Sequence, residues 1–438
     1  MRVFLRTHLA TLALVAATTS VACGQAVPAS SMSPSVGPGM PSVDGIFHYA
    51  LSGSELLQTG NGSGLGYSTA LSGDASYSSR SIVRPFSMTY AGGVLLGNQY
   101  SQRATTFQNF ALSQGLVAGE WIFGISDSVS YLPQSPTLGL SGIPGVGDLG
   151  SQPIQGPSSG PAGGVLTNNS TNVSNALSGD IERRLTPLTS ISGMGSWSIL
   201  RFPDGNGLES TQIAAEGALN HRLDTRDTIS GSGTYSTFSY GSGIDLTIQT
   251  QGGNLAFQRV LSRKLSMSVS AGPMWISGSN SELVPSRLTV ATDLSVLYSR
   301  KVTTASLSYS RGVNGGSGVQ PGALSDSVAA MVGRTYGRDW VASFTGNYTH
   351  SGGLVKNAGL SGLPAAAFLY AGGTTNLVYG GAQVTRRLSD SLSAFASYNL
   401  QHQSIDSTLL LQNAYSGFNQ TFGIGITFSP HSTRLGQF

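Results

Sequence analysis

Histidine and hydroxyl residues are the side chains of this sequence that could carry out hydrolysis. A hydrolase needs a nucleophile and a base within hydrogen-bond reach of each other. His350 directly follows Thr349, and His402 lies two residues before Ser404. Both histidines share the parity of the apolar residues in their strand patterns, so we expect them in an outer interfacial belt rather than in a catalytic site. Beyond residue 26 the histidines are His48, His221, His350, His402 and His431.

No motif in the sequence predicts a metal or a cofactor. His-x-His, Cys-x-x-Cys and Asp-x-Asp-x-Asp-Gly patterns do not occur. Cys23 is the single cysteine, so we expect neither an intrachain disulfide nor a thiolate metal site. The stretch from Gly312 to Gly318 has the composition of a phosphate-binding loop, but no helix pattern follows it. We interpret it as an extracellular loop tip.

Charged residues gather in short polar turns. Glu182 and Asp224 each lie within two residues of arginines, at positions 183 and 184 and at positions 222 and 226. We expect ion pairs that secure these turns. Exposed pairs stabilise a protein by only about 0–1 kcal/mol each, so they mark the turns rather than perform chemistry.

The turns recur at a regular period. The spacing from Arg184 to Arg222 and from Arg300 to Arg338 is 38 residues in both cases. Two strands of about 11 residues, a tight turn and a longer loop fill such a period. We expect short turns near residues 80–84, 117–120, 185–188, 224–227, 262–264, 300–303, 337–339 and 388–391.

The segments between the turns alternate with period two, which indicates strands. In 265–271 leucine, methionine, valine and alanine alternate with serines, and 305–310 repeats this pattern. The same alternation holds for 392–399, with Phe395 as the exception. Asp127 lies on the apolar parity of its strand, and we expect a β-bulge near Gly124 to move it to the other face.

The last strand has one apolar face and one small, polar face. Apolar residues occupy 418, 422, 424, 426 and 428, while the other parity is Asn, Thr or Gly. This stretch resembles the C-terminal insertion signal of bacterial outer-membrane β-barrel proteins, a porin-like class. The resemblance implies recognition by the barrel-assembly machinery and a location in the outer membrane of a Gram-negative-type bacterium. The signal positions are Thr421, Gly423, Ile426 and Phe428.

Composition agrees with a membrane barrel. The chain has 438 residues, of which only 10% are charged and 59 are glycine, with 39% hydrophobic residues. Soluble surfaces usually need about a quarter of charged residues, and no segment beyond the N-terminus approaches the ~20 apolar residues of a membrane helix. We therefore expect an all-β, membrane-spanning, antiparallel up-and-down β-barrel of about 18 strands. Barrels of 16 or 14 strands are also compatible with the weakly patterned first hairpins.

Aromatic residues mark both ends of the expected strands. On the outward parity they form two groups separated by a membrane-like height, where rings prefer the boundary between lipid and water. A soluble sandwich core is the less favoured alternative, because aromatic residues in a core need not separate to the strand ends. The expected belt residues are Tyr90, Tyr131, Trp197, Tyr235, Tyr309, Tyr348 and Tyr398 at one level, and Trp121 and Trp340 with Phe257, Tyr298, Tyr336 and Phe428 at the other.

The chain divides into four expected segments. Residues 1–26 have the basic, apolar and small-residue regions of a signal peptide. Cys23 lacks the aliphatic residue three positions upstream that lipid-modified cysteines carry, so lipidation is the less favoured alternative. We expect a flexible periplasmic segment at 27–44, the barrel at 45–428 and a C-terminal periplasmic tail at 429–438. The loop 134–172 could constrict the barrel or stay mobile, and its thin apolar content favours mobility.

The expected lumen predicts a channel. Its lining is mostly Ser, Thr, Gly, Asn and Ala, with few charges and no ring of one sign. A barrel of 16 to 18 strands holds a water-filled channel unless it is plugged. We predict a non-enzymatic, porin-like channel for small polar or sugar-like solutes with weak charge selectivity. The charged lining candidates are Asp180, Glu182, Arg184, Glu216, Arg222 and Asp293.

Other functions stay open at this point. A non-conducting barrel could display loops 134–172 and 351–373 for adhesion, serve as a structural protein, or belong to a polysaccharide export system. A hydrolase at the outer rim is a lesser alternative, for which a lumen-facing Ser/His pair would be the discriminating observation. The lipid bilayer is the expected partner, whereas a net charge of +3 does not suggest nucleic acid.

Overall fold

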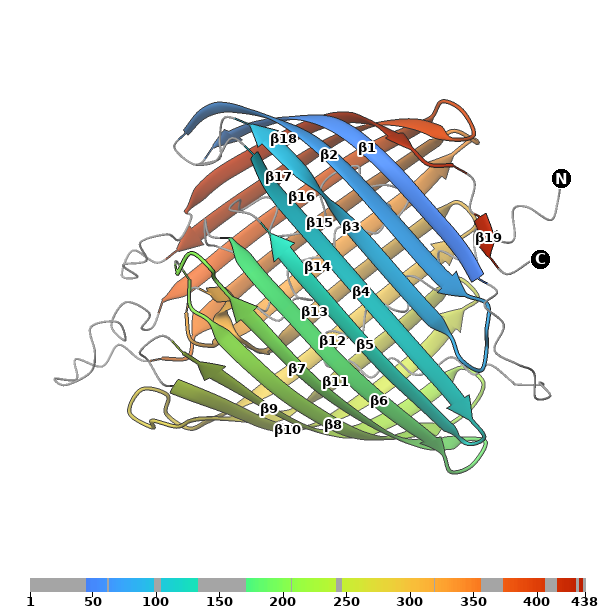
Figure 1. Cartoon of the computed structure of the whole chain (residues 1–438). Coiled ribbons are helices and arrows are strands. Elements are labelled where there is room, and N and C mark those ends of the chain that lie inside the picture. Colours follow the sequence, from blue (N-terminus) through green and yellow to red (C-terminus); the bar gives the residue numbers. More distant parts are fainter. Residues whose placement is uncertain are drawn as a thin grey trace.

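The chain forms a closed antiparallel β-barrel (Figure 1). The computed structural model describes residues 45–60, 63–97, 104–132, 171–205, 207–241, 246–318, 320–355, 373–405, 416–430 and 433–435. The strands are β1 (Gly45–Gly60), β2 (Ser63–Ser79), β3 (Phe86–Gly97), β4 (Ala104–Ala118), β5 (Trp121–Leu132), β6 (Asn172–Arg184), β7 (Thr189–Arg201), β8 (Ser210–Arg222), β9 (Asp227–Tyr240), β10 (Leu246–Ser262), β11 (Leu265–Gly278), β12 (Arg287–Arg300), β13 (Thr303–Asn314), β14 (Ala323–Tyr336), β15 (Trp340–Gly353), β16 (Thr374–Arg387), β17 (Leu392–Ile405), β18 (Gly417–Phe428) and the short β19 (Thr433–Leu435).

Each strand pairs with the next one along the chain, and β18 closes the barrel on β1. The closing register runs from Leu51 opposite Phe428 to Gly60 opposite Asn419. The prediction of an up-and-down barrel with 18 long strands is confirmed. The predicted signal peptide and the segment 27–44 lie outside the described residues.

The short turns lie at one end of the barrel, as predicted. Arg263 and Lys264 alone connect β10 to β11, and Lys301 and Val302 alone connect β12 to β13. Gly337 begins the β14–β15 turn with a φ of 63°, a backbone conformation that glycine adopts without strain. All of the expected turns connect consecutive strands, and they gather on the right of Figure 1, where β19 also lies.

Turn side chains differ in part from the predicted ion pairs. The Asp224 carboxylate accepts hydrogen bonds from the backbone amides of Arg226 and Asp227, the latter at 2.8 Å. This contact is an Asx-type turn, which a short carboxylate makes more readily than a pair with a long side chain. Arg183 lies over the ring of Trp121, with its guanidinium carbon 5.0 Å from the ring centroid. These two residues stabilise the turns mainly through backbone and ring contacts.

The outer face of the barrel is apolar. In β18 the residues Phe418, Phe422, Ile424, Ile426 and Phe428 are 42–65% exposed, while the alternate positions are buried or half-buried. The same alternation runs around the barrel, and no soluble surface exposes such a continuous apolar band. A closed barrel with an apolar exterior satisfies its backbone in lipid, so this chain is a membrane-spanning β-barrel. Among the described residues, no helix is long and apolar enough to cross a membrane.

Asp127 keeps its outward parity, so the predicted bulge near Gly124 is wrong. The β4–β5 and β5–β6 registers run without a shift through both residues. Asn175 lies on the same face of β6 and donates a hydrogen bond of 2.7 Å to the Asp127 carboxylate. Asp127 does not need to change face, because the hydrogen bond from Asn175 partly solvates a carboxylate that lipid cannot solvate.

The C-terminal tail contributes a short strand. Thr433 to Leu435 form β19, which pairs with Gly45 to Phe47 of β1. The sequence pattern showed no alternation here, but three residues are too few for a pattern. Phe438 lies outside the described residues.

Candidate functional site: the barrel lumen

The inward face carries the polar residues of each strand. Ser266, Ser268 and Ser270 of β11 and the serines of β13 at 306, 308 and 310 lie opposite the outward apolar parity, and all are partly exposed. The predicted hydroxyl lining is therefore present along this part of the wall. It can hydrogen-bond to water or to a polar solute, since each hydroxyl both donates and accepts.

Acidic side chains occupy the same side of the lumen. Asp180 and Glu182 lie on the inward parity of β6, Glu216 on that of β8 and Asp293 on that of β12. Gly124 of β5 has no side chain, and the Asp180 carboxylate occupies the space that a Cβ at this position would fill. These acidic candidates therefore project into the lumen, where they form part of one wall.

Two of the acidic side chains influence each other electrostatically. Glu216 accepts a hydrogen bond from Ser232 and lies near enough to Asp293 for repulsion. Ser270 in turn donates a 3.4 Å hydrogen bond to Asp293. Arg184 and Arg222 share the inward parity but stand at the turn ends of β6 and β8. The carboxylates therefore lie deeper in the barrel than these arginines.

The wall made by β14 to β18 and β1 is lined by amides and hydroxyls and is closely packed. Gln401 and Gln403 of β17 and Asn419 of β18 are at most 1% exposed, although they lie on the inward parity. Gln58 of β1 donates to Asn419 across the closing seam at 3.2 Å, and the Ser52 hydroxyl lies 3.0 Å from that of Thr427. This sector is packed, in contrast to the partly exposed serine rows of β11 and β13.

The connection between β13 and β14 lies at the end of the barrel opposite the short turns, as expected, but it folds over the lumen, and Gly312 to Asn314 of the expected loop tip belong to β13. We call residues 315–318 and 320–322 the mouth loop. Tyr240 at the end of β9 donates a 3.2 Å hydrogen bond to the carbonyl of Gly315, and the amide of Leu208 donates to the carbonyl of Gly318 at 2.8 Å. Three strands, β10 to β12, separate Tyr240 from the mouth loop along the wall, and Leu208, in the connection between β7 and β8, lies further away. The mouth loop therefore reaches across the extracellular mouth.

Glycines make this close packing possible. Gly318 has a φ of 76°, and a Cβ there would overlap the ring of Phe202. Gly322 has a φ of 67° and lies against Ile248. Under the loop lies a buried apolar cluster that consists of Leu208, Phe238, Tyr240, Leu246, Ile248, Met274, Ile276, Leu283, Val284, Leu354 and Val355.

One lumen-facing Ser/His pair is present among the residues that the structure describes. His48 Nε2 lies 3.1 Å from Ser429 Oγ, and both residues follow the inward parity of the β1–β18 seam. The pair stands at the turn end of the barrel, whereas the rim hydrolase was expected at the opposite, extracellular end. This contact joins Ser429, which follows β18, to His48 of β1. We infer that it stabilises the closure of the barrel.

The outer face carries a polar row near the extracellular end. His350 Nδ1 lies 2.7 Å from Asn376 Oδ1, to which the hydroxyl of Tyr348 also donates at 3.3 Å. One strand further, Arg311 and Asp326 form an ion pair of 2.9 Å. Four of these residues pair in register on neighbouring strands and all four lie on the outward parity: Arg311, Asp326, His350 and Asn376. The outward position predicted for His350 is thus found, and His402 likewise lies outward against Phe418.

The expected belt residues all occupy the outward parity. Tyr90, Tyr131, Trp197, Tyr235, Tyr348, Trp121 and Trp340 are 37–45% exposed, and Tyr309 and Tyr398 are half-buried. In the insertion-signal stretch, Ile426 and Phe428 point outward, and Thr421 and Gly423 point inward. Their contact with lipid and with assembly factors is a proposal that this placement allows.

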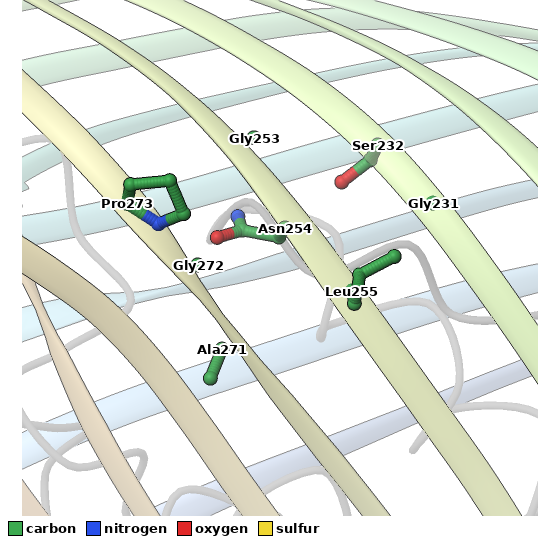
Figure 2. A pocket seen from close by; sticks show the side chains of 8 residues that line it. All are labelled: Gly231, Ser232, Gly253, Asn254, Leu255, Ala271, Gly272 and Pro273. Carbon is green, nitrogen blue, oxygen red and sulfur yellow. The ribbon is translucent and has the colours of Figure 1, made fainter.

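A pocket of about 340 Å³ lies in the wall formed by β9, β10 and β11 (Figure 2). Leu255 and Pro273, which line it, belong to the outward parity, and Leu255 is 70% exposed. Pro273 has no N–H to donate, and the β10–β11 pairing is interrupted opposite it. Ser232, Asn254 and Gly272 of the inward parity also line it, so the pocket lies within the wall where the β10–β11 pairing is interrupted.

The amide-lined wall made by β14 to β18 and β1 was not predicted as a site. Its signal is the inward parity of Asn399, Gln401 and Gln403, which alternate with outward Tyr398, Leu400 and His402. The predicted lining candidates were all charged, so these uncharged amides were not among them. A search of the inward parity for side chains with both donors and acceptors would have found them.

Comparison with known proteins identifies no family. No protein-family model matches the chain, and no curated protein sequence matches it. Among solved structures, OccK2 (OpdF) of Pseudomonas aeruginosa in complex with glucuronate is 10% identical, with a TM-score of 0.41 over 88% of this chain and 98% of that chain. OpdK of Pseudomonas aeruginosa with vanillate is 8% identical, with a TM-score of 0.42 over 89% and 99%. OccAB4 of Acinetobacter baumannii is 8% identical, with a TM-score of 0.42 over 90% and 99%. A likeness at this level assigns neither family nor substrate to this chain.

Proposed function

We propose that this barrel is a porin-like channel for small polar or sugar-like solutes in the outer membrane of a Gram-negative-type bacterium. The observation that carries the proposal is the contrast between the two faces of β11 and β13. Their outward residues are apolar, whereas their inward serines are partly exposed to the lumen. A hydroxyl-lined wall allows water and polar solutes to pass along it without a large desolvation cost.

The charges of the lumen favour cations weakly over anions. Glu216 and Asp293 lie inside the barrel, whereas Arg184 and Arg222 stand at its turn end. A low-dielectric wall strengthens the field of such carboxylates on a passing ion. Because the hydroxyls outnumber the carboxylates on this wall, neutral solutes also pass.

The mouth loop limits the size of the solute. It closes part of the extracellular end through its contacts with Tyr240 and Leu208. Inward loops of this kind narrow a wide barrel to a constriction. Solutes therefore pass between the mouth loop and the opposite wall.

Assembly of the channel requires the C-terminal strand. Phe428 is exposed on the outer face at the end of β18, where it is available to the barrel-assembly machinery. The adhesive alternative depends on loops 134–172 and 351–373, which lie largely outside the described residues, and the structural and export alternatives stay untested. Among the described residues of the extracellular rim, His350 and His402 face outward, which does not favour the enzyme alternative.

Ion conductance tests the proposed function. Refolded protein whose heat-modifiable migration shows a closed barrel is reconstituted into planar bilayers. We expect discrete current steps and a reversal potential in a salt gradient that indicates mild cation preference. A folded barrel that never conducts would exclude the channel.

A further inference from the structure

Arginines occupy outward positions at the turn end of five strands. All five are exposed, and they lie where the apolar band of the outer face meets the short turns. A cation at the edge of a membrane-spanning segment can reach the polar boundary of the bilayer with its charged head. The residues are Arg183 of β6, Arg259 of β10, Arg300 of β12, Arg334 of β14 and Arg386 of β16.

These arginines differ in whether a carboxylate neutralises them. Arg259 lies 3.6 Å from Asp227 on the neighbouring strand. Within the described part of the chain, neither Arg334 nor Arg386 forms an ion pair. In the turn 337–339, between their strands, one arginine and one aspartate offset each other. Two positive charges on β14 and β16 are therefore left for an anionic partner.

An aromatic ring lies against each of these two guanidinium groups. The guanidinium carbon of Arg334 is 5.0 Å from the centroid of the Tyr336 ring, and that of Arg386 is 5.2 Å from the Trp340 ring. Trp340 pairs in register with Tyr336 on one side and with Arg386 on the other. We call Arg334, Tyr336, Trp340 and Arg386 the arginine patch. A guanidinium stacked on a ring is oriented by it and keeps its N–H edge for hydrogen bonds.

The arginine patch borders apolar residues on the side toward the middle of the barrel. Val332, Phe344 and Val384 are 41–55% exposed on the outward parity. Ala342 lies in register between Arg334 and Val384, so no long side chain stands between these two residues. The surface thus has cations at the turn end and apolar groups next to them. A lipid molecule with its headgroup at the turns has the same polarity.

The outer face of β5 and β6 holds only half of this arrangement. Arg183 lies over Trp121, but its outward neighbour on β7 is the apolar Ile191. A single cation over a ring needs no ligand to explain it. In the arginine patch, two strand spacings, about 10 Å, separate the backbones of Arg334 and Arg386. Their charges repel each other at the edge of a low-dielectric bilayer unless an anion lies between them.

We propose that the arginine patch binds the headgroup of an anionic membrane phospholipid, whose acyl chains lie along Val332 and Phe344. Arginine donates charge-assisted, bidentate hydrogen bonds to phosphate oxygens. Short turns mark the periplasmic side of outer-membrane barrels, so the lipid belongs to the periplasmic leaflet. This inference goes beyond the proposed channel and does not depend on conduction.

Native mass spectrometry of the refolded, detergent-solubilised full chain tests the site. Dioleoyl-phosphatidylglycerol is titrated onto the barrel, and dioleoyl-phosphatidylcholine, which has the same acyl chains and no net charge, is titrated in parallel. We compare the wild type with Arg334→Gln, Arg386→Gln and the double variant. Arg387→Gln is the matched control, because Arg387 is the next residue on β16, has the opposite parity and is paired with Asp390 at 2.7 Å.

The wild type should bind phosphatidylglycerol more tightly than phosphatidylcholine. A basic residue near an anionic lipid strengthens binding about fivefold. We therefore expect each single variant to weaken phosphatidylglycerol binding about fivefold and the double variant about 25-fold. The control should change it less than twofold, and no variant should alter phosphatidylcholine binding. Heat-modifiable migration verifies that each variant is folded, and the single variants suffice if the double variant does not fold.

The outcomes separate a lipid site from a general attraction of anions. Equal affinity of the wild type for the two lipids, or an equal loss in Arg386→Gln and Arg387→Gln, overturns the proposal. Displacement of phosphatidylglycerol by inorganic phosphate at millimolar concentration shows a site for free anions and also overturns it. A patch-dependent preference in a barrel that does not conduct supports the lipid site and overturns only the channel.

Discussion

Releasing the mouth loop by one methyl group tests how the lumen is constricted. Gly318 adopts a φ of 76°, and a Cβ at this position would overlap the ring of Phe202. Gly318→Ala therefore adds two costs to the docked loop. The left-handed backbone costs a residue with a Cβ about 1–2 kcal/mol, and overpacking against an aromatic ring costs about 1–3 kcal/mol.

The sum destabilises docking by about 2–5 kcal/mol. A change of about 3 kcal/mol alters the ratio of docked to released loop about 100-fold. Among the described residues, the loop is held by hydrogen bonds from Tyr240, from the amide of Leu208 and from the amide of Leu354, and by packing on Phe202 and Ile248. We expect a released loop and a wider mouth, while the barrel ladder, which does not include these residues, stays intact.

Proteolysis and conductance report the release. Proteinase K is added to the folded barrel, and mass spectrometry follows cleavage within 315–322. Gly312→Ala is the matched control, because Gly312 lies on β13 and a Cβ there would meet no atom within 4 Å. We expect faster cleavage and larger current steps in Gly318→Ala only. Unchanged cleavage and conductance in a folded Gly318→Ala barrel would refute the docked loop as the constriction.

Four further predictions concern the wall and the turns. Backbone hydrogen bonds from the turn lower the pKa of Asp224 below its usual 3.8, so its stabilisation is present above pH 3.8 and is lost as the pH falls through the folded value; an NMR titration that finds 3.8 or higher contradicts this. Asp127→Leu replaces a lipid-facing carboxylate and should raise the free energy of unfolding in liposomes by about 1 kcal/mol, measured by urea titration, whereas a decrease would show that its hydrogen bond outweighs the cost of the charge. Phe428→Ser should reduce outer-membrane levels more than Phe438→Ser, and equal levels on immunoblots would oppose that ranking. Glu216→Gln should shift the reversal potential in a salt gradient toward lower cation selectivity, and an unchanged potential would remove this carboxylate from the permeation path.

The sequence allowed the barrel and its turns to be predicted because both depend on local patterns. Alternation in 265–271 and the terminal strand shows which parity faces outward, and the regular Arg-bearing turns set the strand count. Phe395 broke the alternation as predicted: it is 6% exposed, faces the lumen and packs over Gly425. The local pattern thus identified Phe395 as the residue of this strand that departs from the alternation.

Contacts between distant segments could not be predicted in this way. The mouth loop meets Tyr240 across three intervening strands and Phe202 across five, and glycine-rich composition alone says only that the backbone is permissive. Whether Gln401 is satisfied depends on its neighbours in β16 and β18, which the pairing register determines. Asp127 was predicted to face inward because charges generally avoid lipid. The hydrogen bond from Asn175 on the neighbouring strand makes the outward position tolerable.

Single-channel recording of the refolded, heat-modifiable full chain tests the central claim most directly. The account predicts discrete current steps that neutral oligosaccharides block partially and reversibly. A correctly folded barrel that gives no current steps under any applied voltage would contradict it.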